Sequence, residues 1–341
     1  MFDFLDTSAK KAFDGKSVLV TGGTGSFGRQ FVRTILQVSS PNRLIVLSRD
    51  EQKHFAMAQE LSDSEFPALR YFLGDVRDRD RLELSMRGVD IVVHAAAQKH
   101  VPLAEYNPTE CVHTNILGSE NVVRAAMQSG VKKVLALSTD KAVNPINLYG
   151  ATKLASEKIF VAANNLSGMD GTRFSVVRYG NVVGSNGSVI PHFQALIDQG
   201  YDNLPITDER MTRFWITLQQ GANFVISSIA QMVGGEVFVP KIPSMKLVDL
   251  ARVLAPNLSH SLIGIRPGEK LHETLVSFAE GINTLEFEDR YVIEPSFAFW
   301  EQRNLPKPGV LVQENFEYAS DTSAFQLTAD DLKNMLSELP K

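Results

Sequence analysis

Cysteine is almost absent from this chain. Its 341 residues contain one, Cys111, so no disulfide can form within the chain and no metal site can be built from cysteines alone. We expect Cys111 to be an inert buried thiol, with a reactive role as the open alternative. This cysteine usage fits a reducing compartment, and the cytoplasm is the expected location.

Clustered positive charge and long apolar runs are lacking too. Lys and Arg total 34 against 39 Asp and Glu, which gives a net charge of -5 and a pI near 5.9, so nucleic acid is not an expected partner. No apolar run approaches the roughly 20 residues that cross a bilayer, and residues 1–14 do not resemble a signal peptide, so no membrane partner is expected. The histidines show no metal-ligand spacing, which predicts no metal.

Short apolar runs alternate with longer amphipathic stretches from the start of the chain. This spacing predicts a Rossmann-type doubly wound parallel α/β sheet, whose strands are buried by crossover helices on both faces. The expected strands are residues 17–20, 43–47, 69–73, 90–94, 133–137 and 174–178.

The alternation breaks beyond about Asn181. We therefore expect residues 15–180, with returning later segments, to form the sheet domain and residues 181–330 to form mainly a smaller lobe. Residues 328–339 are predicted to form a terminal helix, and the proline-rich stretch 305–308 a surface connection.

A glycine-rich turn follows the first expected strand and opens a helix. Its glycines are spaced three apart, which allows a tight turn, a close backbone approach to a pyrophosphate, and close packing of the helix on the sheet. The helix N-terminus would add free N–H groups and partial positive charge. A plain glycine turn is the alternative, but the strand before and the helix after favour a dinucleotide site. The expected contacts are Gly22, Thr24, Gly25, Ser26, Phe27 and Gly28.

The residues after the second strand indicate which dinucleotide is bound. An NAD site would place an acidic side chain on the ribose 2′-hydroxyl, whereas this strand runs into Ser48 and Arg49. A hydroxyl and a guanidinium suit a 2′-phosphate, so NADP is favoured, with Lys53 as a possible second cation. Asp50 is an acidic side chain at the same strand end and favours NAD instead.

The end of the third strand offers a contact for the adenine. Asp75 could accept a hydrogen bond from the adenine amino group, with Val76 beside it. A cap on the following helix is the open alternative for Asp75.

Tyr149 and Lys153 are four residues apart at the start of an expected helix. They would share one helix face and converge on one ligand. A phenol has an unperturbed pKa near 10, but a neighbouring ammonium and a cationic nicotinamide would favour the phenolate. Such a tyrosine could take a proton from a sugar hydroxyl. An ordinary helix face is the alternative.

Together, the glycine turn, the Tyr149/Lys153 pair and the Thr139 hydroxyl resemble the extended short-chain dehydrogenase/reductase family, which modifies nucleotide sugars. Its 4,6-dehydratases carry Thr-Asp-Glu at the strand end, whereas this chain has Thr139-Asp140-Lys141. The lysine resembles the inverting 4,6-dehydratases, lyases that act on UDP-N-acetylglucosamine and invert C5. Further similar segments are 94–102, 178–182, 212–215 and 266–270.

The resemblance implies roles for each group at the strand end. Tyr149 would deprotonate the sugar 4-hydroxyl, and Thr139 would hydrogen-bond the same oxygen. Lys141 would be the base at C5, and Asp140 the acid that helps the 6-hydroxyl leave. Lys141 must then be partly neutral, which we expect Lys153 and the nicotinamide to encourage. A structural Asp140–Lys141 ion pair is the alternative.

The resemblance also implies the remaining contacts and partners. UDP-N-acetylglucosamine is the expected substrate, in the first step of pseudaminic acid-type sugar synthesis, and a homo-oligomer, dimer or hexamer, is expected. A 4-epimerase, a retaining dehydratase and a silent NADP-sensing regulatory module stay open as alternatives. The expected further cofactor contacts are Ala95, Ala96, Lys99, Tyr149 and Lys153, and the substrate contacts are Lys99, Asn181, Arg213, Arg266 and Glu269.

Overall fold

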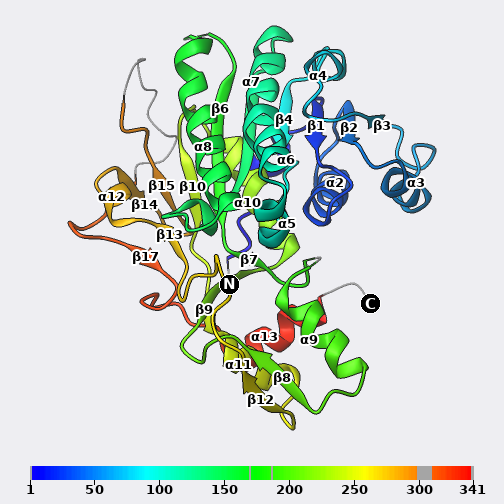
Figure 1. Ribbon diagram of the computed structural model, residues 1–341. Coiled ribbons are helices and arrows are strands. Elements are labelled where there is room, and N and C mark those ends of the chain that lie inside the picture. Colours follow the sequence, from blue (N-terminus) through cyan, green and yellow to red (C-terminus); the bar gives the residue numbers. More distant parts are fainter. Residues whose placement is uncertain (1, 169, 186, 298–308, 339–341) are drawn as a thin grey trace.

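The central sheet begins with six parallel strands in the order β3-β2-β1-β4-β5-β6. A computed structural model describes residues 2–168, 170–185, 187–297 and 309–338 (Figure 1). The strand order is that of a Rossmann-type fold, so the predicted fold class is confirmed. The six strands are β1 (Ser17–Thr21), β2 (Arg43–Ser48), β3 (Leu69–Leu73), β4 (Ile91–His94), β5 (Lys133–Thr139) and β6 (Arg173–Tyr179), within two residues of the predicted ranges.

Helices cover both faces of this sheet. The chain moves in one direction along the sheet from β1 to β3 and in the other from β4 to β6. Right-handed crossovers therefore place the two sets of connecting helices on opposite faces. The first set is α2 (Ser26–Val38) and α3 (Glu51–Glu60), and the second is α7 (Gly118–Gln128) and α8 (Leu148–Ser167). Shorter helices in this part are α1 (Thr7–Lys11), α4 (Arg79–Ser85), α5 (Val101–Tyr106), α6 (Pro108–Val112), η1 (His113–Leu117) and η2 (Asp140–Ala142).

Later segments return to the central sheet. β10 pairs parallel with β6, and β15, β14 and β16 follow it in antiparallel pairs, so the described residues contribute ten strands to the sheet. The domain boundary near residue 180 stays a prediction, with these strands as the returning segments. The elements are α10 (Leu218–Gln231), β10 (Val237–Pro240), α12 (Phe278–Gly281), β14 (Thr284–Glu286), β15 (Arg290–Ile293) and β16 (Val310–Leu311).

The other late elements build a lobe with its own core, seen below the sheet in Figure 1. Trp215 is fully buried in that core. The elements are β7 (Asn181–Val182), α9 (Val189–Asp198), β8 (Asn203–Ile206), β9 (Thr212–Ile216), β11 (Ser244–Lys246), α11 (Leu247–Leu254), β12 (Ser259–Leu262) and α13 (Ala329–Ser337). β13 (Thr274–Val276) and β17 (Tyr318–Ala319) pair with each other and pack against the core of the central sheet.

Several smaller predictions have outcomes in the structure. The terminal helix is α13, which Thr328 caps by accepting from Asp331 N, and Cys111 is fully buried. The stretch 305–308 lies outside the described residues. Among the described residues, no helix has the length and apolar character to cross a membrane, and no three His, Cys, Asp or Glu side chains group as a metal site.

A buried ion-pair network ties the sheet to the later segments. Arg178 on β6 is 1% exposed and bonds Glu157 on α8 at 2.6 Å and Glu280 on α12 at 2.9 Å. Burial opposes its charge, but the two carboxylates outweigh this effect and raise the pKa of Arg178. This network fixes α8, the helix that carries Tyr149, against the part of the chain that follows β13.

Candidate active site

The glycine turn lies between β1 and β4, where the strand order reverses. Gly22 has a φ of 64°, and a Cβ there would lie 2.8 Å from Ala96 Cα, so only glycine fits. A Cβ on Gly28 would lie 2.5 Å from Gly23 Cα, which explains the close packing of α2. Gly25 is the N-cap of α2 and no side chain caps this helix, so its first N–H groups fit a pyrophosphate.

Neighbouring side chains fix the shape of the turn. Thr24 Oγ1 lies 2.8 Å from Ser48 Oγ and joins the turn to the end of β2. Ala96 N donates to Thr21 Oγ1 at 3.3 Å, and Ala95 N donates to Thr21 O at 3.2 Å, so both alanines lie behind Gly22. Ser26 and Phe27 form the first turn of α2.

The end of β2 holds two cations, Arg49 and Lys53, each near a carboxylate. Asp50 caps α3 by accepting from Lys53 N at 3.0 Å, and this bond lowers the pKa of Asp50 despite some desolvation. The acidic residue that argued for NAD is therefore used as a helix cap. Arg49 is 58% exposed and its Nη1 lies 3.9 Å from Asp75, while Lys53 Nζ lies 3.3 Å from Asp50 Oδ2.

Asp75 lies at the end of β3 in an ion pair with Arg77. Arg77 Nη2 donates to Asp75 Oδ2 at 2.8 Å, and desolvation is outweighed by these bonds, so the pKa of Asp75 is lowered. α4 is capped by Asp78, which accepts from Arg81 N, so a helix cap at Asp75 is wrong. Val76 is buried against Gly118.

Tyr149 and Lys153 lie on the inner face of α8. Tyr149 is 8% exposed and Lys153 is 4% exposed, and Lys153 Nζ donates to Leu137 O at 2.7 Å. Burial lowers the pKa of Lys153 to about 8. Burial and Asp140 raise the pKa of Tyr149 to about 12, against the opposing effects of Lys141 and Thr139.

The upward shift at Tyr149 differs from the expected stabilisation of its phenolate. The prediction relied on the Lys153 ammonium and on a nicotinamide charge. In the protein without a ligand, burial is the largest effect, and Lys141 is the cation that opposes it. Burial therefore disfavours the phenolate of Tyr149, and Lys141 and Thr139 offset only part of this effect.

The Asp140–Lys141 pair lies directly after β5, in η2. Lys141 Nζ donates to Asp140 Oδ1 at 2.9 Å, and Thr139 Oγ1 donates to the same oxygen at 2.8 Å. Asp140 is fully buried, and its Oδ2 has no hydrogen-bond partner among the described residues. Asp140 Oδ1 therefore accepts both hydrogen bonds, and Oδ2 is buried beside it.

The expectation that Lys153 and the nicotinamide make Lys141 partly neutral stays a prediction, and the surroundings of Lys141 in this structure shift its pKa in the other direction. Burial lowers the pKa of Lys141, but the charges of Asp140 and Glu273 outweigh burial, and the net shift is upward. The expectation considered Lys153 and a nicotinamide, and it omitted Glu273, which lies 132 positions further along the chain than Lys141.

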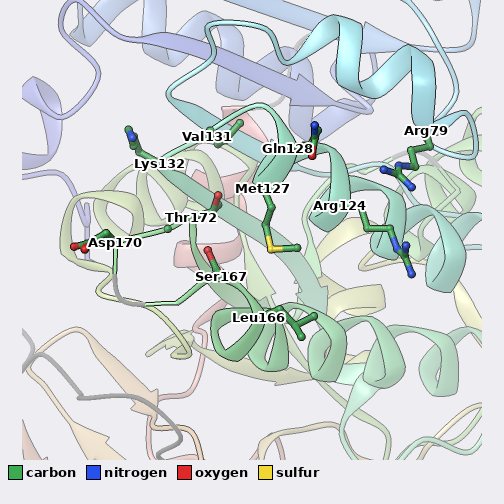
Figure 2. A pocket seen from close by; sticks show the side chains of 12 residues that line it. Arg79, Arg124, Met127, Gln128, Val131, Lys132, Leu166, Ser167, Asp170 and Thr172 are labelled. Carbon is green, nitrogen blue, oxygen red and sulfur yellow. The ribbon is translucent and has the colours of Figure 1, made fainter.

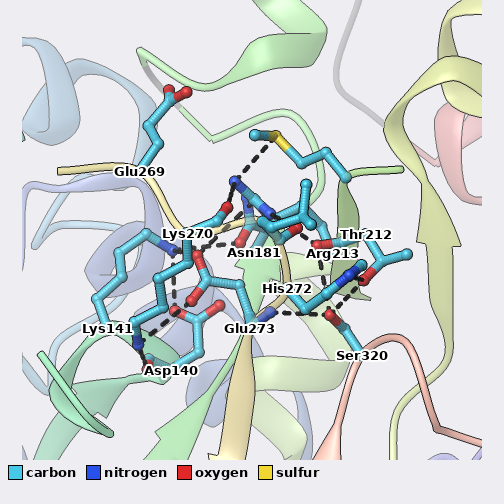
Figure 3. A network of polar contacts seen from close by, with 12 residues as sticks. Asp140, Lys141, Asn181, Thr212, Arg213, Glu269, Lys270, His272, Glu273 and Ser320 are labelled. Carbon is cyan, nitrogen blue, oxygen red and sulfur yellow. Dashed lines mark hydrogen bonds and ion pairs between the residues drawn. The ribbon is translucent and has the colours of Figure 1, made fainter. Parts of the chain in front are cut away.

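Glu273 and Lys270 are site residues that the sequence analysis missed. Figure 3 shows both beside Asp140 and Lys141. Glu273 Oε1 lies 3.5 Å from Lys141 Nζ, and Lys270 Nζ lies 3.7 Å from Glu273 Oε2. Their one signal is position, since Lys270 ends the similar segment 266–270 and Glu273 follows it by three residues.

The predicted substrate residues fall into two groups. Asn181 Oδ1 accepts from Lys141 Nζ at 3.4 Å, and Arg213 Nε lies 3.8 Å from Glu273, so both belong to the charged cluster. Arg213 is 8% exposed and donates to the carbonyls of residues 212, 270 and 271. Its predicted phosphate contact stays a prediction, and its bonds here are structural.

Arg266 and Glu269 lie apart from this cluster. The Arg266 side chain is 56% exposed, with Nη1 3.9 Å from Glu269 Oε1, and Figure 3 shows Glu269 directed away from Asp140. Asn147 Nδ2 donates to Gly268 O at 2.8 Å, while Asn147 Oδ1 caps α8. One side chain thus joins this loop to the helix of Tyr149. Lys99 follows β4, and desolvation lowers its pKa.

A surface pocket lies at the opposite edge of the sheet, where β5 and β6 begin (Figure 2). Its two arginines already have carboxylate partners, since Arg79 bonds Glu83 at 2.8 Å and Arg124 bonds Glu120 at 2.6 Å. The charged cluster and the glycine turn lie instead at the carboxyl ends of the strands, where ligands bind in open α/β sheets.

A glycine turn at the strand-order reversal and a Tyr/Lys pair beside the end of β5 define an enzyme of the short-chain dehydrogenase/reductase class, which binds a nicotinamide dinucleotide. The family described as "Polysaccharide biosynthesis protein" matches residues 18–295, and the chain belongs to this family. The resemblance to the extended short-chain dehydrogenases/reductases is thereby confirmed, together with its subgroup of nucleotide-sugar 4,6-dehydratases.

Individual relatives agree with this membership. The chain is 54% identical to a UDP-N-acetylglucosamine 4,6-dehydratase (inverting) of Campylobacter jejuni, over 95% of this chain and 98% of that protein. It is 40% identical to a UDP-glucose 4-epimerase of Rickettsia canadensis, over 82% and 83% of the two chains. The structure of Pen from Bacillus thuringiensis has a TM-score of 0.86 at 36% identity, covering 96% of this chain and 99% of Pen.

Proposed function

We propose that this chain is an NADP-dependent UDP-N-acetylglucosamine 4,6-dehydratase that inverts C5. The observation that carries the proposal is the Asp140–Lys141 pair, with 2.9 Å between Nζ and Oδ1, beside the buried Tyr149. The Campylobacter jejuni relative supports the choice of substrate and stereochemistry. An epimerase does not need an acid and a base beside C5 and C6, and a retaining dehydratase would have glutamate at position 141.

The cofactor, when bound, accepts a hydride from C4 of the sugar and later returns it to C6. Tyr149 takes the proton of the 4-hydroxyl, so its phenol must first be deprotonated. The positive charge of the bound nicotinamide and the Lys153 ammonium favour the phenolate, against the burial that raises the pKa of Tyr149 to about 12. Thr139 would hydrogen-bond the same sugar oxygen. Loss of this proton and of the hydride would leave a ketone at C4.

The ketone acidifies the C5–H bond, and the Asp140–Lys141 pair then acts on it. An ammonium–carboxylate pair and an amine–carboxylic acid pair hold the same number of protons. One proton transfer along the 2.9 Å contact therefore converts the resting pair into the working pair. Lys141 takes the C5 proton, Asp140 gives its proton to the 6-hydroxyl, and water leaves. With a hydride returned to C6, Lys141 would give the proton it holds back to C5 on the opposite face, and the product would be UDP-4-keto-6-deoxy-L-arabino-HexNAc.

The UDP half of the substrate would be held by the segment around residue 266. Arg266 is exposed and would pair with the diphosphate, and Glu269 would accept from a ribose hydroxyl. Asn181 and Lys99 would contact phosphate oxygens. Arg213 would reach the diphosphate only after releasing backbone carbonyls that it now bonds.

The first prediction concerns the wild-type protein. Incubated with UDP-N-acetylglucosamine in heavy water, it should give a 4-keto-6-deoxy product with one deuteron at C5 and inverted configuration, since the C5 proton passes through the enzyme. Proton NMR of the reaction measures both. Retained configuration at C5 would instead indicate a retaining dehydratase, and a product that keeps its 6-hydroxyl would indicate an epimerase. Absence of any turnover would favour the NADP-sensing regulatory module.

The second prediction concerns NADP. Arg49→Ala should weaken NADP binding about ten- to hundred-fold and leave NAD binding nearly unchanged, because a charge-assisted bond to the 2′-phosphate contributes roughly 1.5–3 kcal/mol. Binding constants for both cofactors, measured by isothermal titration, test this. Arg79→Ala is the matched control, since Arg79 is an exposed arginine at the other edge of the sheet. Equal losses for both cofactors would refute the role of Arg49.

We also propose that the enzyme acts in the cytoplasm as a dimer or hexamer and opens a pseudaminic acid-type pathway. The resemblance to the inverting dehydratases supports these three statements. Ultracentrifugation of the purified chain measures the oligomeric state directly.

A further inference from the structure

Glu273 is a buried carboxylate that the proposed mechanism does not use. Its side chain is 3% exposed and it directly precedes β13. Ser320 holds the backbone of Glu273 through two hydrogen bonds. Glu273 N donates to Ser320 Oγ at 2.9 Å, and Ser320 N donates to Glu273 O at 2.8 Å. The carboxylate is therefore held in place by the fold.

Three cations surround this carboxylate at ion-pair distances. Oε1 lies 3.5 Å from Lys141 Nζ and 3.8 Å from Arg213 Nε, and Oε2 lies 3.7 Å from Lys270 Nζ. Oε2 is buried without a hydrogen-bond partner among the described residues. Since these distances exceed those of good hydrogen bonds, Glu273 acts on its neighbours mainly through its charge.

We propose that Glu273 is a positioning residue, whose charge sets how readily Lys141 releases its proton. This proposal rests on the proposed function, in which Lys141 must become neutral to act at C5. The groups that face Lys141 come from every element around it: Asp140 on η2, Tyr149 on α8, Asn181 on β7, Arg213 on β9, and Lys270 and Glu273 before β13.

The signs of these charges make the proposal specific. Glu273 and Asp140 stabilise the Lys141 ammonium, and Arg213 opposes it. Burial lowers the pKa of Lys270, and the charge of Lys141 lowers it further. This repulsion is mutual, so Lys270 also opposes the Lys141 ammonium. Removing Glu273 should therefore ease proton loss from Lys141, whereas removing Lys270 should hinder it. A residue that only supports the fold would not produce opposite effects.

Competitive labelling with acetic anhydride, followed by mass spectrometry, tests this third prediction on the protein without substrate. Below its pKa, an amine is acylated in proportion to its neutral fraction. At pH 9 we expect Glu273→Gln to raise the labelling rate of Lys141 about tenfold or more, and Lys270→Met to lower it. Lys10 on α1 is the internal reference, and Glu236→Gln, a buried glutamate bonded to Ser175, is the matched control.

An unchanged Lys141 rate in Glu273→Gln, or an increase in Lys270→Met, would overturn the proposal. If Glu273→Gln does not fold by circular dichroism, Lys270→Met carries the test, and Glu273→Asp should keep the wild-type rate within a few-fold. The same variants also have a functional readout. The acid limb of the C5 exchange rate should move to lower pH in Glu273→Gln and to higher pH in Lys270→Met. Labelling needs no substrate, so it separates a failure of this proposal from a failure of the proposed function.

Discussion

The Tyr149→Phe variant should lose turnover of UDP-N-acetylglucosamine by about 10²–10⁴-fold while it keeps its fold and its NADP affinity. The phenol is the group placed to take the 4-hydroxyl proton, and phenylalanine fills the same space on α8 without it. The side chain is 8% exposed, so no water can easily replace it. Single-turnover reduction of NADP, followed by its absorbance, measures the first step directly.

The matched control for this variant is Tyr179→Phe. Tyr179 ends β6 and is also 8% exposed, and burial strongly raises its pKa, yet it has no part in the mechanism. We expect this control to keep wild-type NADP reduction within a few-fold. Near-normal reduction in Tyr149→Phe would remove Tyr149 from the mechanism.

The pH dependence of the first step follows from Tyr149 and Lys153. The reactive phenolate gains population as the pH rises, because Tyr149 has a raised pKa of about 12 before the cofactor binds. The Lys153 ammonium, which helps the phenolate, is lost as the pH rises through its lowered pKa of about 8. The two effects oppose one another above about pH 8, so the rate should level off there instead of rising further.

Much of the fold could be predicted because its signals are local. The first six strands are continuous apolar runs, and each was predicted within two residues. The glycine turn was equally readable from its spacing between a strand and a helix, and at Gly28 the excluded Cβ would meet Gly23 of the same turn. Local patterns of this kind are visible in a sequence without any knowledge of distant contacts.

The electrostatics of the site could not be predicted in the same way. The Asp140–Lys141 pair is adjacent in sequence, but the charge of Lys141 depends on Glu273, Arg213 and Lys270, which the second lobe brings to η2. Similarly, Asp50 argued for NAD until the structure showed it as the cap of α3. A side chain's charge and free oxygens depend on partners that one sequence segment does not reveal.

The Lys141→Ala variant should still reduce NADP, which depends on Tyr149, but should lose C5 deuterium exchange by about 10²–10⁴-fold. Reduced cofactor would then accumulate without a 6-deoxy product, and combined absorbance and NMR measurements detect both. The charge of Asp140 complicates this variant, since alanine leaves that buried carboxylate with Thr139 as its remaining side-chain donor. Loss of activity alone would not separate a missing base from a disturbed pair.

Lys141→Arg removes this ambiguity. A guanidinium keeps a cation between Asp140 and Glu273, but it does not deprotonate in proteins, so it cannot take the C5 proton. We expect Lys141→Arg to match Lys141→Ala in C5 exchange while keeping NADP reduction near the wild-type rate. Lys141→Glu, which restores the residue type of the retaining dehydratases, should be inactive, because it would face both carboxylates. Rapid C5 exchange in Lys141→Arg would defeat the base assignment, because the base would then have to be another group of the cluster.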